Sequence, residues 1–231
     1  MNNIKTFENF NNQDIFTYIE NNNIKSVKKY IDSGYDLNIQ NNDGITPLMH
    51  ATSNNKIEIV KLLLDSGADP NKQNNNGYTA LMNAALFNKI EITKLLLNAE
   101  ADTNTQDSVA YTALILAVMY NNLEIVKLLL DSGADIDKQN EDGDTALILA
   151  VMCNNLEIVE LLLNAGAYID KQNNNGDTAL ILAAYKNNSE IVEILLDYGA
   201  DEFILNGEDK SFYYYLNDEN KEYFLHKYPT S

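Results

Sequence analysis

Glycine recurs along this chain at intervals of 33 residues, and this period constrains the fold more than any other feature. The positions are Gly34, Gly67, Gly133, Gly166 and Gly199 in one series, and Gly44, Gly77, Gly143 and Gly176 in a second. The length of 231 residues equals seven such periods. Because one unit of this size cannot bury its own apolar side chains, the period predicts units that stack on their neighbours.

A helix start follows each position of the second series by two residues. This position holds Thr46, Thr79, Thr112, Thr145 and Thr178. A Pro or an Ala comes next, and then a Leu. Since Thr can cap free N–H groups and Pro is tolerated in a first turn, the pattern predicts a helix N-terminus. Leu48, Ala51 and Thr52 then share one helix face through their spacing of three and four residues.

A second helix is predicted directly after the first. The first helix ends at Asn55, Asn88, Asn121, Asn154 or Asn187, and Asn readily adopts the left-handed conformation that stops a helix. The second helices are expected over residues 57–64, 90–97, 123–130, 156–163 and 189–196. Glycine of the first series ends all of them except the one over 90–97, and a polar stretch typical of turns follows. The unit is therefore helix, turn, helix, long exposed turn.

The chain resembles the ankyrin repeat family in two motifs, Asp43-Gly44-Ile45-Thr46-Pro47-Leu48 and Leu62-Leu63-Leu64-Asp65-Ser66-Gly67-Ala68-Asp69. The resemblance implies an all-α ankyrin-repeat solenoid, in which stacked helix-turn-helix units carry projecting hairpin loops. Five full repeats are expected, at residues 41–73, 74–106, 107–139, 140–172 and 173–205. Residues 1–40 and 206–231 are expected to be the N-terminal and C-terminal capping repeats.

The chain departs from the family pattern after the Thr-Pro-Leu motif. The family's usual His is replaced by Met49, Met82, Ile115, Ile148 and Ile181. We therefore expect apolar packing in place of the hydrogen bonds that this His would make between repeats.

Two further departures interrupt the glycine series. Glu100 and Ala110 replace glycines at positions where positive φ is expected, which costs about 1 kcal/mol for a residue with a side chain. We expect the junction over residues 99–111 to be the least regular, and a Glu100→Gly substitution to raise the melting temperature.

The C-terminal segment is rich in aromatic residues: Phe212, Tyr213, Tyr214, Tyr215, Tyr223, Phe224 and Tyr228. We expect them to cover the last leucines as a cap, because a terminal repeat must end the stack. The alternative is a patch that binds a partner.

Composition excludes several classes of function. A net charge of −18 argues against binding to nucleic acid or to anionic lipid. No apolar stretch reaches the roughly 18 residues of a membrane span, and the polar residues 1–10 do not resemble a secretory signal. The single cysteine, Cys153, excludes an internal disulfide framework. A reducing, cytoplasmic location is expected.

No set of catalytic or metal-binding residues is recognisable. His50 and His226 are far apart in the repeat series and are expected at the surface or in loose packing. Cys153, alone at the end of a first helix, is expected to be a half-buried filler. The acidic residues 137–143 lack the order of a calcium-binding loop. We therefore expect no enzymatic activity, cofactor or metal.

In proteins similar to this one, partners contact the hairpin tips and the ends of the first helices. Carried over position by position, this surface comprises Tyr78, Leu86, Phe87, Tyr111, Met119, Tyr120, Asp144, Met152, Cys153, Asp177 and Tyr185. Aromatic residues and Met are typical of interface centres, and Asp144 and Asp177 could steer a basic segment of the partner. Leu86, Met119 and Met152 could instead pack one repeat on the next.

These observations predict a non-enzymatic scaffold that binds a protein partner through the concave face and hairpin loops. The alternative is a structural protein that self-associates through the aromatic residues or the C-terminal cap; a monomer is favoured, with a weak homodimer as the other option. An enzyme or ligand-binding module would need a pocket with convergent polar groups, which the sequence does not indicate.

Overall fold

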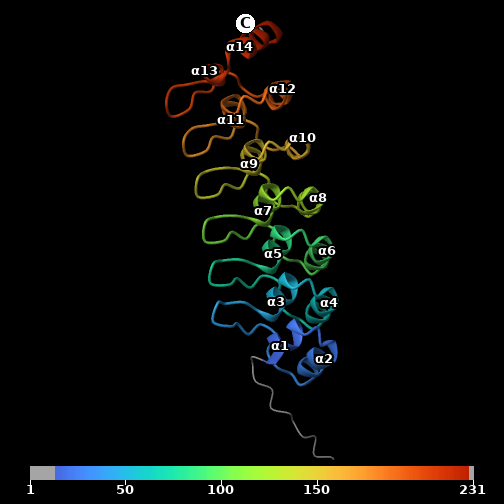
Figure 1. The fold of residues 1–231 in the computed structure, drawn as a ribbon. Helices are drawn as coiled ribbons and strands as arrows, with labels where there is room; N and C mark the ends of the chain where they lie inside the picture. The colour runs from blue at the N-terminus through green and yellow to red at the C-terminus, as the bar shows by residue number, and fades with distance from the viewer. Residues whose placement is uncertain (1–13, 229–231) are drawn as a thin grey trace, which may run out of the picture. The chain divides into compact units, whose positions relative to one another are not determined.

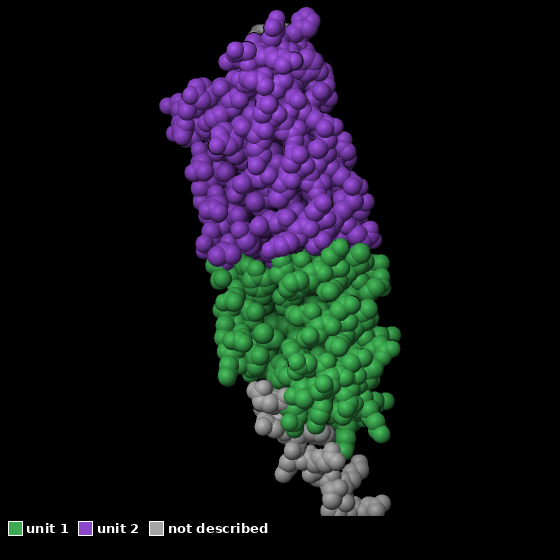
Figure 2. Space-filling model, in the orientation of Figure 1, with its two compact units in different colours: residues 1–108 green, residues 109–231 purple. Residues whose placement is uncertain are grey.

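The structure, a computed structural model, describes residues 14–228, and within that range it contains only helices and no strands. The predicted all-α repeat fold is confirmed. Contacts divide the chain into unit 1, up to Ser108, and unit 2, from Val109 onward (Figure 2). The polar residues 1–10 and part of each expected capping repeat, residues 1–13 and 229–231, lie outside the described residues.

The described part of unit 1, from Asp14 to Ser108, contains three helix pairs. These are α1 (Asp14–Glu20) with α2 (Ile24–Asp32), α3 (Pro47–Ser53) with α4 (Ile57–Asp65), and α5 (Ala80–Leu86) with α6 (Ile90–Asn98). The first helices of the pairs pack in one row and the second helices in another. The loops that connect successive pairs project from the same side of the helices (Figure 1).

Unit 2 repeats this arrangement and adds two helices. Its pairs are α7 (Ala113–Met119) with α8 (Leu123–Asp131), α9 (Ala146–Met152) with α10 (Leu156–Asn164), and α11 (Ala179–Tyr185) with α12 (Ser189–Asp197). Helices α13 (Phe212–Tyr215) and α14 (Asp218–Lys227) follow, and α13 packs on α11. Phe212 and Phe224 are buried, whereas Tyr214 and Tyr223 are exposed, so the C-terminal aromatic residues divide between packing and surface.

The helix boundaries follow the predicted signals. The hydroxyl oxygen of Thr46 accepts a hydrogen bond from the backbone N–H of Met49 at 3.2 Å, and Thr79, Thr112, Thr145 and Thr178 cap their helices in the same way. Each first helix is followed by an Asn with positive φ, for example 56° at Asn55 and 58° at Asn154. Each second helix extends one residue beyond its predicted end.

The five residues that replace the family's His lie in the core. Met49, Met82, Ile115, Ile148 and Ile181 each expose 2% or less of their surface. Apolar packing at this position is therefore confirmed, and its driving force is removal of apolar surface from water.

Hydrogen bonds between repeats come instead from the polar loops. In unit 1 the Gln40 side chain donates to the Gly44 carbonyl of its own loop and to the Gln73 carbonyl of the next, at 2.7 and 2.8 Å. The backbone N–H of Asn75 donates to the carbonyl of Asp43 at 3.1 Å. In unit 2, Gln172 makes the corresponding pair of bonds. The Asn- and Gln-rich stretches thus stack the loops as well as turn the chain.

The two interrupted glycine positions differ from each other. Glu100 and Ala110 have φ of 58° and 62°, as expected. The N–H of Glu100 donates to the Leu97 carbonyl at 3.0 Å, just as Gly67 donates to Leu64, so this helix end is regular. Beside Ala110, however, the loop-to-loop bond from Glu141 to Val109 is 3.3 Å, against 2.8 to 3.1 Å at the equivalent bonds.

Candidate interaction surfaces and a cavity

In unit 1, the end of α5 presents one large aromatic side chain to solvent. Phe87 follows the last residue of the helix, and 52% of its surface is exposed. The chain reverses direction immediately afterwards at Asn88, which has a φ of 52°. Leu86 is half-buried, which suits packing between repeats as much as contact with a partner.

In unit 2, large side chains at the corresponding helix ends are also exposed. Tyr120, Met152 and Tyr185 expose 57%, 42% and 69% of their surfaces, whereas Met119 is half-buried. Because Met152 is exposed, its burial does not support the alternative that this side chain packs one repeat on the next. Cys153 is exposed rather than half-buried, because as the residue after α9 it lies outside the helix-packing face. We call Leu86, Phe87, Met119, Tyr120, Met152, Cys153 and Tyr185 the helix-end residues.

The predicted loop residues separate into two kinds. Tyr78, Tyr111 and Asp177 are half-buried. Asp144, predicted as an exposed acidic contact, is 7% exposed, which corrects that prediction. Its carboxylate accepts a hydrogen bond from the Asn173 amide of the next loop at 2.9 Å, so it joins neighbouring loops. Burial raises the pKa of this carboxyl above its ordinary value, and the Asn173 bond opposes the shift.

One repeat later, the same amide-to-carboxylate bond forms a wall of a cavity. The Asn206 amide donates to Asp177 Oδ1 at 2.8 Å and to the hydroxyl oxygen of Tyr215 at 3.0 Å. Asn206 itself is only 8% exposed. The two bonds therefore fix a carboxylate and a phenol ring relative to each other.

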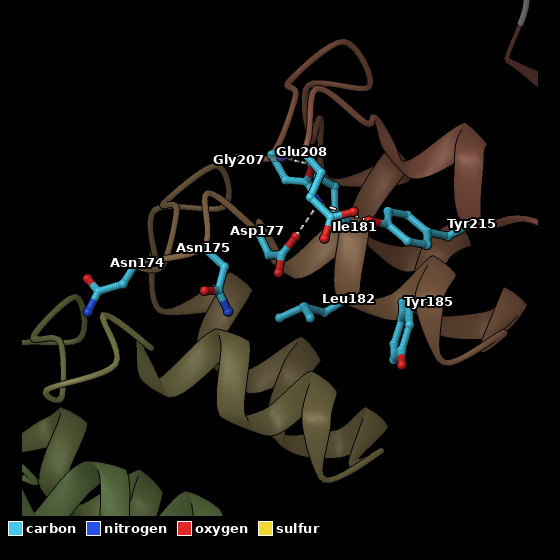
Figure 3. Close-up of a pocket in the computed structure, with 10 residues that line it drawn as sticks. Asn174, Asn175, Asp177, Ile181, Leu182, Tyr185, Gly207, Glu208 and Tyr215 are labelled. Atoms are coloured by element: carbon cyan, nitrogen blue, oxygen red, sulfur yellow. Dashed lines mark hydrogen bonds between the residues drawn. The ribbon is translucent and has the colours of Figure 1, made fainter.

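The cavity has a volume of about 490 Å³ and lies between two successive loops, helix α11 and Tyr215 (Figure 3). Ile181 and Leu182 line it, and the Tyr215 ring points toward the side of Asp177, whereas the Tyr185 ring, also part of the lining, points away from Asp177 (Figure 3). Tyr185 meets Tyr215 edge to face, with ring centroids 5.7 Å apart. Polar and aromatic groups that line one cavity are typical of binding sites, and this grouping was not predicted from the sequence.

The sequence carries a signal for one part of this cavity, the loop that holds Asn206. Asn206 stands in the loop series of Asn41, Asn74, Asn140 and Asn173, whose side chains accept hydrogen bonds from their own loops. This series predicts a further hairpin loop at residues 206–210. Only the structure shows that Tyr215, from the following helix, closes the space behind it.

The remaining candidates add no second site. Among residues 14–228, no three His, Cys, Asp or Glu side chains are grouped to hold a metal ion. His50 is half-buried, with its ring edge-on to Phe16 at 5.6 Å, and His226 is exposed. Within the described range, no helix is both long and apolar enough to cross a membrane.

The chain matches the family described as ankyrin repeats (3 copies) over residues 15–107 and again over 114–206. Among solved structures, it is similar to the ankyrin repeat domain of Bcl-3, described as a unique member of the IkappaB protein family. That match has 29% sequence identity and a TM-score of 0.87, and it covers 92% of this chain and 97% of the Bcl-3 chain.

A second similar structure is the human ASB11 ankyrin repeat domain, with 24% identity and a TM-score of 0.77 over 94% of this chain and 98% of the other. At this identity the likeness concerns the fold alone. A comparison with curated proteins gives no match.

Proposed function

Because the chain belongs to the ankyrin repeat family, whose domains generally mediate protein–protein interaction, we propose that it is a non-enzymatic scaffold that binds a protein partner. The contact surface consists of the helix-end residues and the hairpin loops on the concave side. Its place of action is the cytoplasm, a reducing compartment that suits a chain with one cysteine.

The observation that carries this proposal is the exposure of large apolar side chains at successive helix ends. Phe87 in unit 1 and Tyr120, Met152 and Tyr185 in unit 2 each expose more than two fifths of their surface. Aromatic residues and Met are enriched in the centres of protein interfaces. Phe87 and Tyr120 share one position of the repeat, and Met152 and Tyr185 share the position before it, so exposed apolar side chains recur at the same end of the first helix.

The charge of the chain defines the chemistry of the partner. With 34 acidic against 16 basic residues, the chain attracts a basic segment and repels nucleic acid. The acidic contribution comes from exposed loop residues such as Glu141 and Asp142, since Asp144 is buried.

The proposal is tested by affinity capture with the full chain and a double variant, Phe87→Ala with Tyr120→Ala. We expect the variant to lose most of the captured partner and to keep its thermal stability, because both side chains are more than half exposed. The matched control is Tyr168→Ala with Phe203→Ala, since these rings are equally exposed, at 57% and 62%, and lie away from the helix ends. Equal loss in both variants contradicts the proposed surface.

Self-association is the second candidate, and the exposed C-terminal aromatic residues favour it. Tyr214 and Tyr223 expose 60% and 46% of their surfaces. A homodimer that Tyr214→Ala with Tyr223→Ala abolishes would support this use of the cap.

A further inference from the structure

The cavity of unit 2 combines an acidic wall with an aromatic wall, and its occupant can be inferred from that pairing. We propose that it receives the guanidinium group of an arginine side chain from the protein partner. This inference rests on the proposed function and names the chemistry of one of its contacts.

The acidic wall is Asp177, whose carboxylate is held in place before any ligand arrives. Its backbone N–H donates to Asn173 Oδ1 at 3.0 Å, and its Oδ1 accepts from Asn206 at 2.8 Å. Asp177 remains half-buried rather than closed off. A carboxylate in this setting forms short, charge-assisted bonds with a guanidinium.

The other acidic residue at the cavity, Glu208, already has a cation. Its Oε2 lies 2.7 Å from the ammonium of Lys210. No lining residue of the cavity is basic, so none of them forms an ion pair with Asp177. Asp177 is therefore the carboxylate that an incoming cation would meet.

The aromatic wall consists of Tyr185 and Tyr215. Tyr185 is 69% exposed as a residue, so solvent and a ligand can reach its side chain. Next to the cavity, the Lys210 ammonium lies 5.9 Å from the ring centroid of Tyr215, which lines the cavity, and 4.2 Å from that of Tyr214, which does not. Cations are attracted to the negative face of aromatic rings at such distances.

Arginine fits these walls better than lysine does. A guanidinium is flat and weakly hydrated, so it can stack on a ring while its edge pairs with a carboxylate. The sequence contains no arginine, and all 16 of its basic residues are lysines. A second copy of the chain therefore cannot supply the group, and the occupant comes from another protein.

The test is an NMR titration of the full chain with Nα-acetyl-arginine amide and with its neutral citrulline analogue. We expect saturable shifts of the Asp177, Tyr185 and Gly207 backbone signals, with a dissociation constant in the range of about 1 mM. The citrulline analogue, which keeps the shape but not the charge, should bind at least about tenfold more weakly. No saturation by the arginine compound, or equal binding of citrulline, overturns the proposal.

Two variants assign the binding to the two walls. Asp177→Asn keeps the acceptor for Asn206 and removes the charge, so we expect at least about fivefold weaker binding. Tyr185→Leu keeps an apolar side chain without a π face, and we expect about threefold weaker binding. Asp201→Asn changes the net charge equally but lies outside the cavity, and it should bind as the unmodified chain does. Equal effects of the two Asp variants overturn the assignment.

Failure here is distinguishable from failure of the proposed function. A captured partner that depends on Phe87 and Tyr120, together with no binding of the arginine compound, removes the inference and leaves the scaffold role. Arginine binding without any protein partner removes the scaffold role instead.

Discussion

Thr93 lies where the second helix of every other full repeat carries a valine. The equivalent residues are Val60, Val126, Val159 and Val192, all fully buried. Thr93 is equally buried, and its hydroxyl oxygen has no hydrogen-bond partner among the described residues. A buried hydroxyl without a partner destabilises the folded state by about 1–3 kcal/mol.

Replacing this threonine by valine, Thr93→Val, should therefore raise the free energy of unfolding by about 1 kcal/mol. Urea denaturation followed by circular dichroism measures the change. The reverse substitution in unit 2, Val126→Thr, is the matched control and should lower stability by a similar amount. An unchanged Thr93→Val variant would mean that the hydroxyl has a partner in solution.

At the residue scale, Asp144 also makes the stability of the fold depend on pH. Burial raises the pKa of its carboxyl, so the folded state binds its proton more tightly than the unfolded state does. A group with a raised pKa stabilises the folded state at pH values below its ordinary pKa, which is near 4 for Asp. This stabilisation is lost as the pH rises through the pKa that the group has in the folded state. At neutral pH the buried charge therefore destabilises the loop.

Asp144→Asn should stabilise the chain at pH 7 and lose this advantage near pH 4. The substituted amide can still accept the hydrogen bond from Asn173. Denaturation midpoints at both pH values measure the difference. A variant that is less stable at pH 7 would show that Asn173 compensates the buried charge fully.

At the scale of elements, the loops depend on small residues at their tips. A Cβ atom added at Gly44 would lie 2.7 Å from the backbone nitrogen of Asn75, and one at Gly176 would lie 2.7 Å from that of Gly207. Ala110 carries such a Cβ, and the loop-to-loop bond beside it, from Glu141 to Val109, is the long one at 3.3 Å. At Gly67, whose place Glu100 takes in the next repeat, a Cβ would meet nothing within 4 Å.

Ala110→Gly should therefore stabilise the chain more than Glu100→Gly does. Ala110→Gly removes the strain of positive φ and the crowding by the next loop, so we expect the free energy of unfolding to rise by about 1–2 kcal/mol. Glu100→Gly removes only the strain of positive φ, and we expect a rise of at most about 1 kcal/mol. Both are measured as changes in melting temperature. Hydrogen exchange at Glu141 should slow only in Ala110→Gly; a larger gain from Glu100→Gly would contradict this account of the junction.

Tyrosine hydroxyls attach the C-terminal helices to the last full repeat. Tyr213 donates to Glu202, and Tyr228 donates to Asp197. Burial, and then the hydrogen bond to a carboxylate, raise the pKa of both phenols. Because the pKa of each phenol is higher in the folded state, the protonated phenols stabilise the fold fully at pH values below their ordinary pKa, which is near 10. This stabilisation is lost as the pH rises toward the pKa of the folded state.

The segment over α13 and α14 should therefore loosen above about pH 10. Tyr213→Phe should lower stability at pH 7 by about 1 kcal/mol and reduce the alkaline loss. Tyr214→Phe is the control, since its ring is exposed and should leave both unchanged. Hydrogen exchange at Phe224 across this pH range reports the effect; an alkaline loss that persists in Tyr213→Phe with Tyr228→Phe would contradict it.

Most of the fold could be predicted from the sequence, because capping threonines, stopping Asn and Gly residues and apolar spacing are local signals. The exposure of Phe87 and Tyr120 was predictable for the same reason, since both follow a helix end. The burial of Asp144 and the cavity beside Asp177 were not. Both depend on side chains from the next loop, Asn173 and Asn206, and no local pattern encodes that contact.

At the scale of the whole molecule, the proposed function depends on which surface stays exposed in solution. The helix-end residues are interpreted as a site for a different protein, and the cavity as a site for an arginine that this chain lacks. Both interpretations require that the chain does not cover these residues with a second copy of itself. A net charge of −18 supports this, because like charges repel.

Light scattering over a wide concentration range tests this claim most directly. We expect a monomer of 26.0 kDa at every concentration, which leaves Tyr120 and its equivalents free for a partner. A dimer that dissociates on dilution, and that Tyr120→Ala abolishes, would show that the proposed surface binds another copy of the chain and would contradict the account.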